Sequence, residues 1–125
     1  MSQRGVLLGR HCEDEAVRFL KRMGYKIIER NYRSRFGEID AIAIDRGSLV
    51  FVEIKSRSSP LFGPPQLRIT KKKRHNIIKT ALSYLKRHSS VDAYCRIDVV
   101  AISLDKNKDR IELIKDAFGA TGRYI

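Results

Sequence analysis

The stretch GEIDAIAIDRGSLVFVEIKSR, residues 37–57, most constrains how this chain can fold. Apolar residues dominate on both sides of Arg46 and Gly47, and the flanking segments are rich in isoleucine and valine. This pattern predicts two β-strands, 37–45 and 48–57, joined in a tight hairpin. Because hairpin strands are antiparallel neighbours, each residue of one strand then has a definite partner on the other.

The register of this hairpin decides which charged residues meet. With a two-residue turn, Asp40 lies directly opposite Glu53, on the same face of the sheet. Glu38 then lies opposite Lys55, so an otherwise apolar face ends in a cluster of charges. A bulged three-residue turn would instead put Asp40 and Glu53 on opposite faces. The inferences on chemistry below use the two-residue turn.

Helical periodicity appears both before and after the hairpin. Apolar residues recur at three- and four-residue spacing from Leu8 to Met23, and Gly24 is placed as a C-terminal cap. Residues 66–87 carry a second stripe of this kind, after a loop with all three prolines. Further strands are expected at 25–33, 94–104 and 110–118. The order α-β-β-β-α-β-β predicts an α/β fold, a mixed central sheet flanked by helices, in one domain spanning residues 1–125.

Asp40 and Glu53 would place two carboxylates side by side, where they repel each other unless a cation lies between them. A divalent ion such as Mg²⁺ relieves the repulsion, because it prefers one or two carboxylates together with water and phosphate oxygens. Lys55, on the same face, could bind a phosphate or a nucleophilic water. This combination favours phosphodiester hydrolysis. The alternative is structural, with Lys55 paired to Glu38 or Glu53 and no metal bound.

At these residues the sequence resembles the PD-(D/E)xK nuclease superfamily, which has a restriction-endonuclease-like core. Asp40 is followed, after twelve residues, by Glu53-Ile54-Lys55. The resemblance is closer with one bacterial family, the YraN-like proteins, which are similar to archaeal Holliday-junction resolvases. The matching motifs run through nearly the whole chain: GRHCEDEA, RNYRSRFGEIDAIAID, LVFVEIKSR, FGPP, RIDVVAI and DAF.

The resemblance implies roles for four residues. Asp40 and Glu53 would bind Mg²⁺ or Mn²⁺, and Lys55 would be the catalytic lysine. Glu13, in the first helix, would be a further acidic member of the catalytic site. On this basis the chain is expected to be a metal-dependent endonuclease.

Four other positions bear on the resemblance. Ile39 stands where the superfamily often has proline, and Cys12 stands where the family usually has glycine. Arg96 and Asp98 match the family, and we expect them to orient the end of the sheet rather than contact a metal.

The charge of the chain favours a nucleic acid as its partner. Lysine and arginine number 26 against 14 acidic residues, a net charge of +12. Basic residues at the start of the second helix oppose its dipole unless a phosphate lies nearby. The alternative is a solvated helix face. The candidate nucleic-acid-binding residues are Arg33, Arg35, Arg57, Lys71, Lys72, Lys73 and Arg74.

These features favour an endonuclease that hydrolyses DNA, with branched or junction-like DNA as a candidate substrate. Cutting a junction needs two sites, hence a homodimer. Two alternatives stay open: a non-catalytic nucleic-acid-binding module that retains the nuclease fold, and a basic protein that assembles with an acidic protein. No stretch approaches the roughly 18 apolar residues of a membrane span, and the first residues do not resemble a signal peptide. We therefore expect no membrane partner and a cytoplasmic location.

Overall fold

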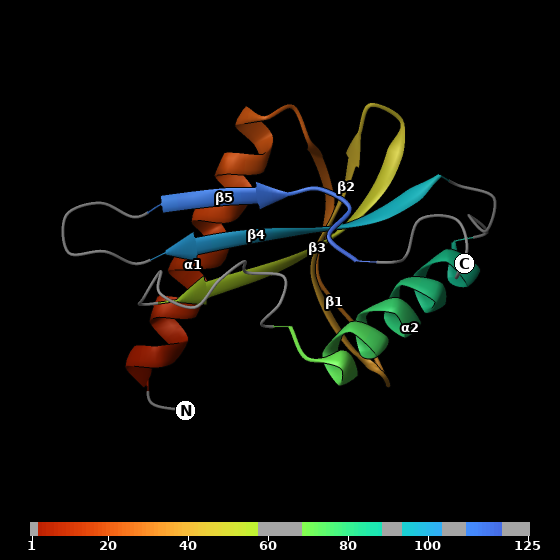
Figure 1. Cartoon of the computed structure of the whole chain (residues 1–125), viewed down its shortest axis with the longest axis horizontal. Helices are drawn as coiled ribbons and strands as arrows, with labels where there is room; N and C mark the ends of the chain where they lie inside the picture. The colour runs from red at the N-terminus through yellow and green to blue at the C-terminus, as the bar shows by residue number, and fades with distance from the viewer. Residues whose placement is uncertain (1–2, 58–68, 89–93, 104–109, 119–125) are drawn as a thin grey trace.

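Seven helices and strands follow one another in the described part of the chain, in the order expected from the sequence (Figure 1). The computed structural model describes residues 3–57, 69–88, 94–103 and 110–118. The elements are α1 (Gln3–Arg22), β1 (Lys26–Ser34), β2 (Gly37–Asp45), β3 (Ser48–Arg57), α2 (Lys71–Arg87), β4 (Cys95–Ser103) and β5 (Arg110–Ile114). The predicted α/β fold is confirmed, and it has the arrangement implied by a restriction-endonuclease-like core.

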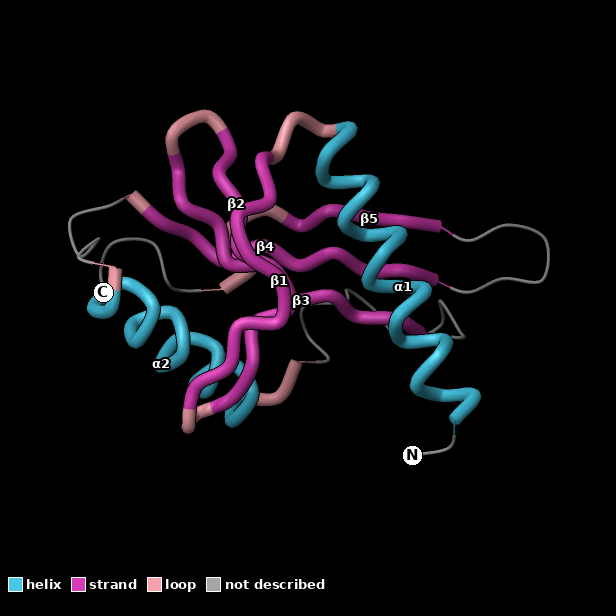
Figure 2. Tube along the Cα trace, turned by 180° about the vertical axis from the view of Figure 1, so that it is seen from behind, coloured by secondary structure: helices cyan, strands magenta, loops and turns pink. Residues whose placement is uncertain are grey.

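The strands form one mixed sheet in the order β1-β2-β3-β4-β5. Neighbouring strands run antiparallel, except for β3 and β4, which run parallel. A parallel pair needs a crossover connection, and α2 lies in the connection between β3 and β4. The two helices lie on opposite faces of the sheet, as the two views in Figures 1 and 2 show.

Each face of the sheet carries its own hydrophobic core. The central strand β3 divides its side chains between them, with Phe51 packed on the α2 side and Val50 and Val52 on the α1 side. The same alternation continues on β4, where Ile97 packs toward α2 and Val100 toward α1. Both faces of the central strands are therefore covered, which explains their long apolar runs.

Helix α1 ends at the predicted glycine cap. Gly24 has a φ of +95°, in the left-handed region that glycine adopts most easily. The backbone N–H of Tyr25 donates to the carbonyl of Leu20 at 2.9 Å, and that of Gly24 donates to Lys21 at 3.0 Å. These two bonds form a Schellman motif, which satisfies carbonyls that would otherwise lack partners.

Helix α2 begins later than the sequence periodicity suggested. Thr70 is its N-cap, and the threonine hydroxyl accepts a hydrogen bond of 3.1 Å from the backbone N–H of Lys73. The helix therefore starts at Lys71, and residues 66–68, which were expected to open it, lie outside the described residues, as does the proline-rich loop. Neither described helix is long and apolar enough to cross a bilayer.

The turn between β2 and β3 has the predicted two residues. Arg46 and Gly47 both have positive φ, +50° and +85°, as a type I′ hairpin turn requires. The paired residues are Asp45 with Ser48, Ile44 with Leu49, Ala43 with Val50, Ile42 with Phe51 and Ala41 with Val52. The predicted register is therefore confirmed, and the bulged alternative is excluded.

The ladder between β2 and β3 ends at Ala41 and Val52, earlier than expected. Beyond this pair, Glu38 lies opposite Arg33 of β1, and the Arg33 Nε lies 3.5 Å from Glu38 Oε2. The expectation that Glu38 faces Lys55 is therefore wrong, and Asp40 and Glu53 lie just beyond the ladder rather than as a directly opposed pair within it. The reason is that β2 leaves β3 and continues with β1 alone.

A kink in the β1–β2 hairpin accounts for this separation. Asn31 of β1 has a φ of +54°, and asparagine is one of the few residues that tolerate the left-handed region. It lies across from Asp40, whose neighbours face different cores: Ala41 packs toward α1 and Ile39 toward α2. A regular strand would put both neighbours on the same face. The hairpin therefore turns over at Asp40, and its outer half runs beside α2 (Figure 2).

Candidate active site

The kink holds Asp40 at the point where β2 separates from β3. The carboxylate Oδ2 of Asp40 accepts a hydrogen bond of 2.7 Å from the backbone N–H of Ile54 on β3. If the β2–β3 ladder continued, this N–H would donate to a backbone carbonyl of β2. The kink removes that carbonyl, and the Asp40 carboxylate accepts the hydrogen bond in its place. This short bond anchors Asp40 beside the strand that carries Glu53.

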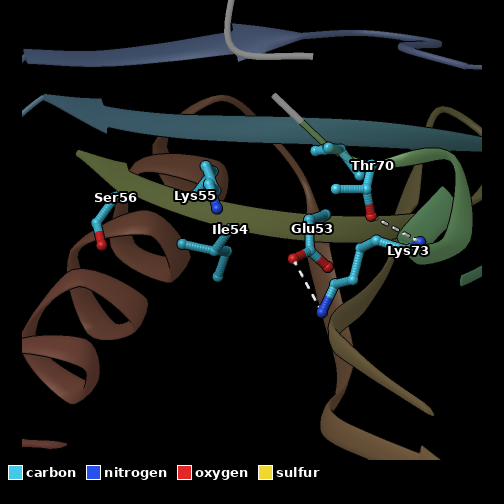
Figure 3. A pocket seen from close by; sticks show the side chains of 7 residues that line it. Glu53, Ile54, Lys55, Ser56, Thr70 and Lys73 are labelled. Carbon is cyan, nitrogen blue, oxygen red and sulfur yellow. Dashed lines mark hydrogen bonds and ion pairs between the residues drawn. The ribbon is translucent and has the colours of Figure 1, made fainter. Parts of the chain in front are cut away.

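Glu53 lies on the face of β3 that is turned toward α2. It follows Phe51 at the alternate position, and only 7% of it is exposed. Lys73, in the first turn of α2, reaches toward it, with the Lys73 Nζ 3.6 Å from Glu53 Oε1 (Figure 3). A buried carboxylate therefore has one partly exposed lysine as its direct ion-pair partner.

Burial raises the pKa of both carboxyl groups, and nearby carboxylates raise it further. Burial is the main cause for Asp40, and its pKa rises to about 6, because burial and the nearby charges of Glu13 and Glu38 outweigh the opposing effects of Ile54 N–H and Lys73. For Glu53, burial and then the charge of Asp40 raise the pKa to about 7 against Lys73 and Lys55. At both groups burial outweighs the neighbouring cations, and a positive charge placed between the carboxylates would lower both pKa values.

A pocket of about 370 Å³ opens beside Glu53. It is lined by residues 53–56 of β3 and by Ile69, Thr70 and Lys73 at the start of α2 (Figure 3). Lys55 lies two residues beyond Glu53 on the same strand and forms no ion pair with Glu38 or Glu53 among the interactions of the described residues. The salt-bridge alternative for Lys55 is therefore absent, and Lys55 is one of the residues that line the pocket.

The first helix contributes to the same site. Glu13 is half-buried on α1, and its charge raises the pKa of Asp40. Three acidic side chains from α1, β2 and β3 thus influence one another, although no group of three His, Cys, Asp or Glu among the described residues is close enough to form a complete metal cage. The structure brings Glu13, Asp40, Glu53 and Lys55 to one region, as the sequence suggested.

The candidate nucleic-acid-binding residues of α2 have different environments. Lys71 and Lys72 are exposed on the first turn, beside Lys73. Arg74 is half-buried: its Nε donates to the carbonyl of Ile69 at 3.0 Å, and its guanidinium lies 5.6 Å from the ring of Phe118. Arg74 therefore holds the start of α2 in place.

Arg33 and Arg35, two candidates outside α2, do not line the Glu53 pocket. Arg57 ends β3, but its side chain is not among those described. Arg33 and Arg35 lie at the tip of the β1–β2 hairpin and line a second pocket, together with Lys86 and Arg87 of α2. The sequence did not signal this second pocket, because it joins residues about fifty positions apart through the kink.

A buried polar network lies on the other face of the sheet, toward α1. Asp98 is fully buried, and it accepts hydrogen bonds from the hydroxyl of Tyr25 at 2.7 Å and from Arg96 Nε at 2.9 Å. Arg96 also reaches Asp45 at 2.6 Å, and the backbone N–H of Asp116 donates to Asp98 at 2.9 Å. As expected, Arg96 and Asp98 orient strand ends rather than join the carboxylate site. The participation of Tyr25 and Asp45 was not predicted.

Comparison with known proteins agrees with the motifs. The model of the uncharacterised protein family UPF0102 matches residues 12–102, which include all four proposed catalytic residues. The UPF0102 protein of Geobacter metallireducens is 45% identical over 118 residues, which cover 94% of this chain and 97% of the relative. That of Syntrophus aciditrophicus is 50% identical over 111 residues, 88% of this chain and 87% of the relative. That of Desulfosudis oleivorans is 47% identical over 112 residues, covering 90% and 89%. The chain therefore belongs to the UPF0102 family, the YraN-like proteins that its motifs resemble.

Proposed function

We propose that this protein is a metal-dependent endonuclease of the PD-(D/E)xK superfamily that hydrolyses phosphodiester bonds in DNA. The observation that carries the proposal is a pair of carboxylates, the half-buried Asp40 and the buried Glu53, held on neighbouring strands beside Lys55 and Lys73. Burial raises the cost of ionising both groups, and the charges of Glu13 and Glu38 near Asp40, and of Asp40 near Glu53, add to that cost. A bound cation would offset it.

The carboxylate pair fits a hydrated Mg²⁺ or Mn²⁺ ion better than a zinc ion. Mg²⁺ uses one or two carboxylates and keeps several waters, whereas zinc sites use three or four protein ligands. Asp40 and Glu53 supply the first kind of site, and the described residues offer no group of three ligands for the second. When bound, such an ion supplies charge stabilisation to the transferring phosphate and lowers the pKa of a coordinated water.

The remaining side chains would act on the phosphate and on water. Lys55 lines the pocket and can donate to a phosphate oxygen or hold the attacking water. Lys73 pairs with Glu53, and a cation at Glu53 would free the Lys73 ammonium to bind a second phosphate oxygen. Glu13 adds negative charge near Asp40, which favours a cation there.

The net charge of +12 supports DNA as the partner, because counterions released from phosphates drive binding of a basic protein. Branched DNA is the proposed substrate structure, in line with the resemblance to junction resolvases. Resolving a junction takes two cuts, which a homodimer with two sites would provide.

A cleavage assay tests this function directly. Purified protein with Mg²⁺ or Mn²⁺ should cut at least one of a set of linear, nicked, flap and four-way DNA substrates, and chelation should stop the reaction. RNA versions of the same structures show which nucleic acid is preferred. If no substrate is cut with either metal, the endonuclease proposal is wrong.

A second function is favoured by one specific observation. Lys73 already neutralises Glu53 in part, so the fold does not depend on a metal to hold this carboxylate. A non-catalytic nucleic-acid-binding module would use the same basic surface without chemistry. It predicts salt-sensitive DNA binding that is unaffected by Glu53→Ala and by metals, in a protein that cuts nothing.

Metal affinity should depend strongly on pH, because the metal competes with protons for Asp40 and Glu53. With pKa values of about 6 and about 7, both carboxyl groups are protonated at about pH 5 and ionised at about pH 9. We expect the Mn²⁺ affinity to rise as the pH increases through this range and then to level off. Calorimetry in buffers of different ionisation enthalpy measures the protons released, and an affinity that does not change between these limits contradicts the prediction.

The same pKa values predict how the stability of the metal-free protein depends on pH and how Glu53→Gln changes it. The folded metal-free protein binds more protons than the unfolded chain, so the stability contributed by these groups is present at low pH and is lost as the pH rises through about 7. Glu53→Gln cannot ionise, and it should raise the melting temperature of the metal-free protein at alkaline pH by a few degrees. It should also remove the upper step from the pH profile of metal binding.

A further inference from the structure

A second pocket lies between the tip of the β1–β2 hairpin and the C-terminal half of α2. It has a volume of about 650 Å³ and is lined by residues 32–36 together with Ser83, Lys86 and Arg87. We call it the tip groove. It is separate from the pocket that holds Glu53, which opens at the other end of α2.

The tip groove gathers positive charge from two elements. Arg33 and Arg35 are on the hairpin side, and Lys86 and Arg87 are exposed on the helix side. Basic residues in the last turn are favourable for the α2 dipole, which explains the second pair without any ligand. Glu38, 3.5 Å from Arg33, offsets one of the hairpin charges. The dipole and this ion pair do not explain why Arg35 lines the same groove, since like charges brought together repel unless an anion offsets them.

The tip of the hairpin is fixed in position by α2. Ser34 Oγ lies 2.9 Å from Thr80 Oγ1, and Thr80 is fully buried. The backbone N–H of Phe36 donates to the same Ser34 hydroxyl at 3.1 Å. The groove is therefore formed before any ligand binds, which lowers the entropic cost of binding.

The aromatic rings at the groove are already engaged within the protein. The Arg35 guanidinium lies 4.8 Å from the centre of the Phe36 ring, and the Lys79 ammonium lies 5.4 Å from it. Tyr32 is buried and packs edge-on against Tyr84 at 5.2 Å. Single-stranded nucleic acids are bound largely by stacking on available rings, so this surface is better suited to a phosphate backbone.

The spacing along α2 relates the two pockets. Lys73 and Lys86 are thirteen positions apart on one helix, which separates them by about 20 Å along the helix axis at about 1.5 Å per residue. Phosphates along one strand of duplex DNA are about 3.4 Å apart along the axis, so about 20 Å corresponds to about six base pairs. We infer that the tip groove binds the phosphate backbone of a duplex DNA arm, about six base pairs from the cut bond, which rests on the nuclease function proposed above.

Two double variants test the groove. Each removes one lysine and one arginine from the last turn of a helix. Lys86→Ala with Arg87→Ala removes the basic pair from the last turn of α2. Lys21→Ala with Arg22→Ala removes the matching pair from the last turn of α1, on the opposite face of the sheet. Duplex binding is measured by fluorescence anisotropy over a range of salt concentrations in chelator, so that neither metal nor cleavage contributes.

The α2 variant should reduce the slope of log affinity against log salt by about 0.9 for each phosphate that the protein no longer neutralises. At about 0.1 M salt this weakens binding by roughly tenfold per phosphate, and the α1 variant should keep the wild-type slope and affinity. If both variants bind equally weakly, only overall charge matters and the tip groove is not a binding site. Weaker binding that is confined to unpaired strands would overturn the assignment to duplex.

Cleavage of substrates with different arm lengths separates this inference from the proposed function. Wild type should cut a substrate with an arm of about twelve base pairs faster than one with about four, and the α2 variant should cut both at the slower rate. Equal rates of wild type on both arms would contradict the groove while leaving the nuclease function intact. If wild type cuts nothing but only the α2 variant loses duplex affinity, the groove stands and the nuclease function is wrong.

Discussion

Replacing Asp40 by asparagine should reduce metal-dependent cleavage by more than about a hundredfold in kcat/KM. Loss of a residue that merely supports a metal ligand already costs about 10- to 100-fold, and Asp40 is a proposed ligand. The amide oxygen of asparagine can still accept the hydrogen bond from Ile54 N–H that anchors this position, so the fold should persist. Only the negative charge is removed.

Glu53→Gln should cause a loss of the same size, for the same reason. Lys55→Met should lower kcat by about 10²- to 10⁴-fold, the usual contribution of a positioned proton donor or acceptor. Single-turnover cleavage rates at saturating metal separate the two effects, because added metal can partly rescue a weakened metal site but not a missing lysine.

Glu112→Gln is the control, since Glu112 is an exposed carboxylate on the edge strand β5, which β4 separates from β3. It should keep wild-type activity. Circular dichroism and thermal unfolding of each variant establish that the fold is retained. Equal cleavage by wild type and Asp40→Asn would mean that a contaminating nuclease is responsible, and the site assignment would then be wrong.

Asp98→Ala should destabilise the protein by about 3–5 kcal/mol, the cost of breaking a buried ion pair from one side. Arg96 would keep Asp45 as a partner, but the hydroxyl of Tyr25 and the backbone N–H of Asp116 would lose their acceptor. Buried donors without acceptors are costly because they also lose their hydrogen bonds to water. Chemical denaturation of the metal-free protein measures the free energy of unfolding.

Asp14→Ala is the comparison for an exposed pair. Asp14 lies 2.8 Å from Arg30, as short as many buried contacts, but 52% of its side chain is exposed. Its removal should leave the melting temperature nearly unchanged, because exposed ion pairs contribute little. Tyr25→Phe, which deletes one hydroxyl of the network, should cost about 1 kcal/mol. If Asp98→Ala is tolerated as well as Asp14→Ala, the network does not stabilise the fold.

The central hairpin could be predicted because the residues that determine its turn and its register lie close together in the sequence. Arg46 and Gly47 separate two apolar segments, and a two-residue turn then determines every partner down to Ala41 and Val52. This register also indicated that Asp40 and Glu53 lie near each other, although the two residues lie just beyond the ladder and are not directly paired in it. The two cysteines, Cys12 and Cys95, are both buried and are not joined in a disulfide.

The kink could not be predicted in the same way. Asn31 is a residue that tolerates positive φ, but asparagine occurs in many regular strands, and only packing of the hairpin against α2 selects the kinked form. The alternation of side chains between the two faces of the sheet, which is regular from Ala41 to Asp45, therefore breaks at Ile39. For this reason Glu38, Arg33 and Arg35 were assigned to the wrong neighbours or to none.

The buried polar network around Asp98 depends on contacts between residues that are much farther apart in the sequence than those of the hairpin. Tyr25 and Asp98 are 73 positions apart, and no periodic pattern links them. One signal was present: Arg96 and Asp98 interrupt a strand that is otherwise apolar and buried. Charged residues at alternate positions of such a strand must find partners, but the sequence alone does not identify Tyr25 and Asp45 as those partners.

The kink in β1 also changes the free edge of the sheet. β1 is an edge strand of nine residues, and a straight edge of that length is a template on which a second chain can add a strand. The bulge near Ile28 and the left-handed Asn31 break its free edge into short pieces, and Lys26, Arg30 and Arg33 add charge along it. The distortion that presents Asp40 therefore also protects the protein from edge-to-edge aggregation.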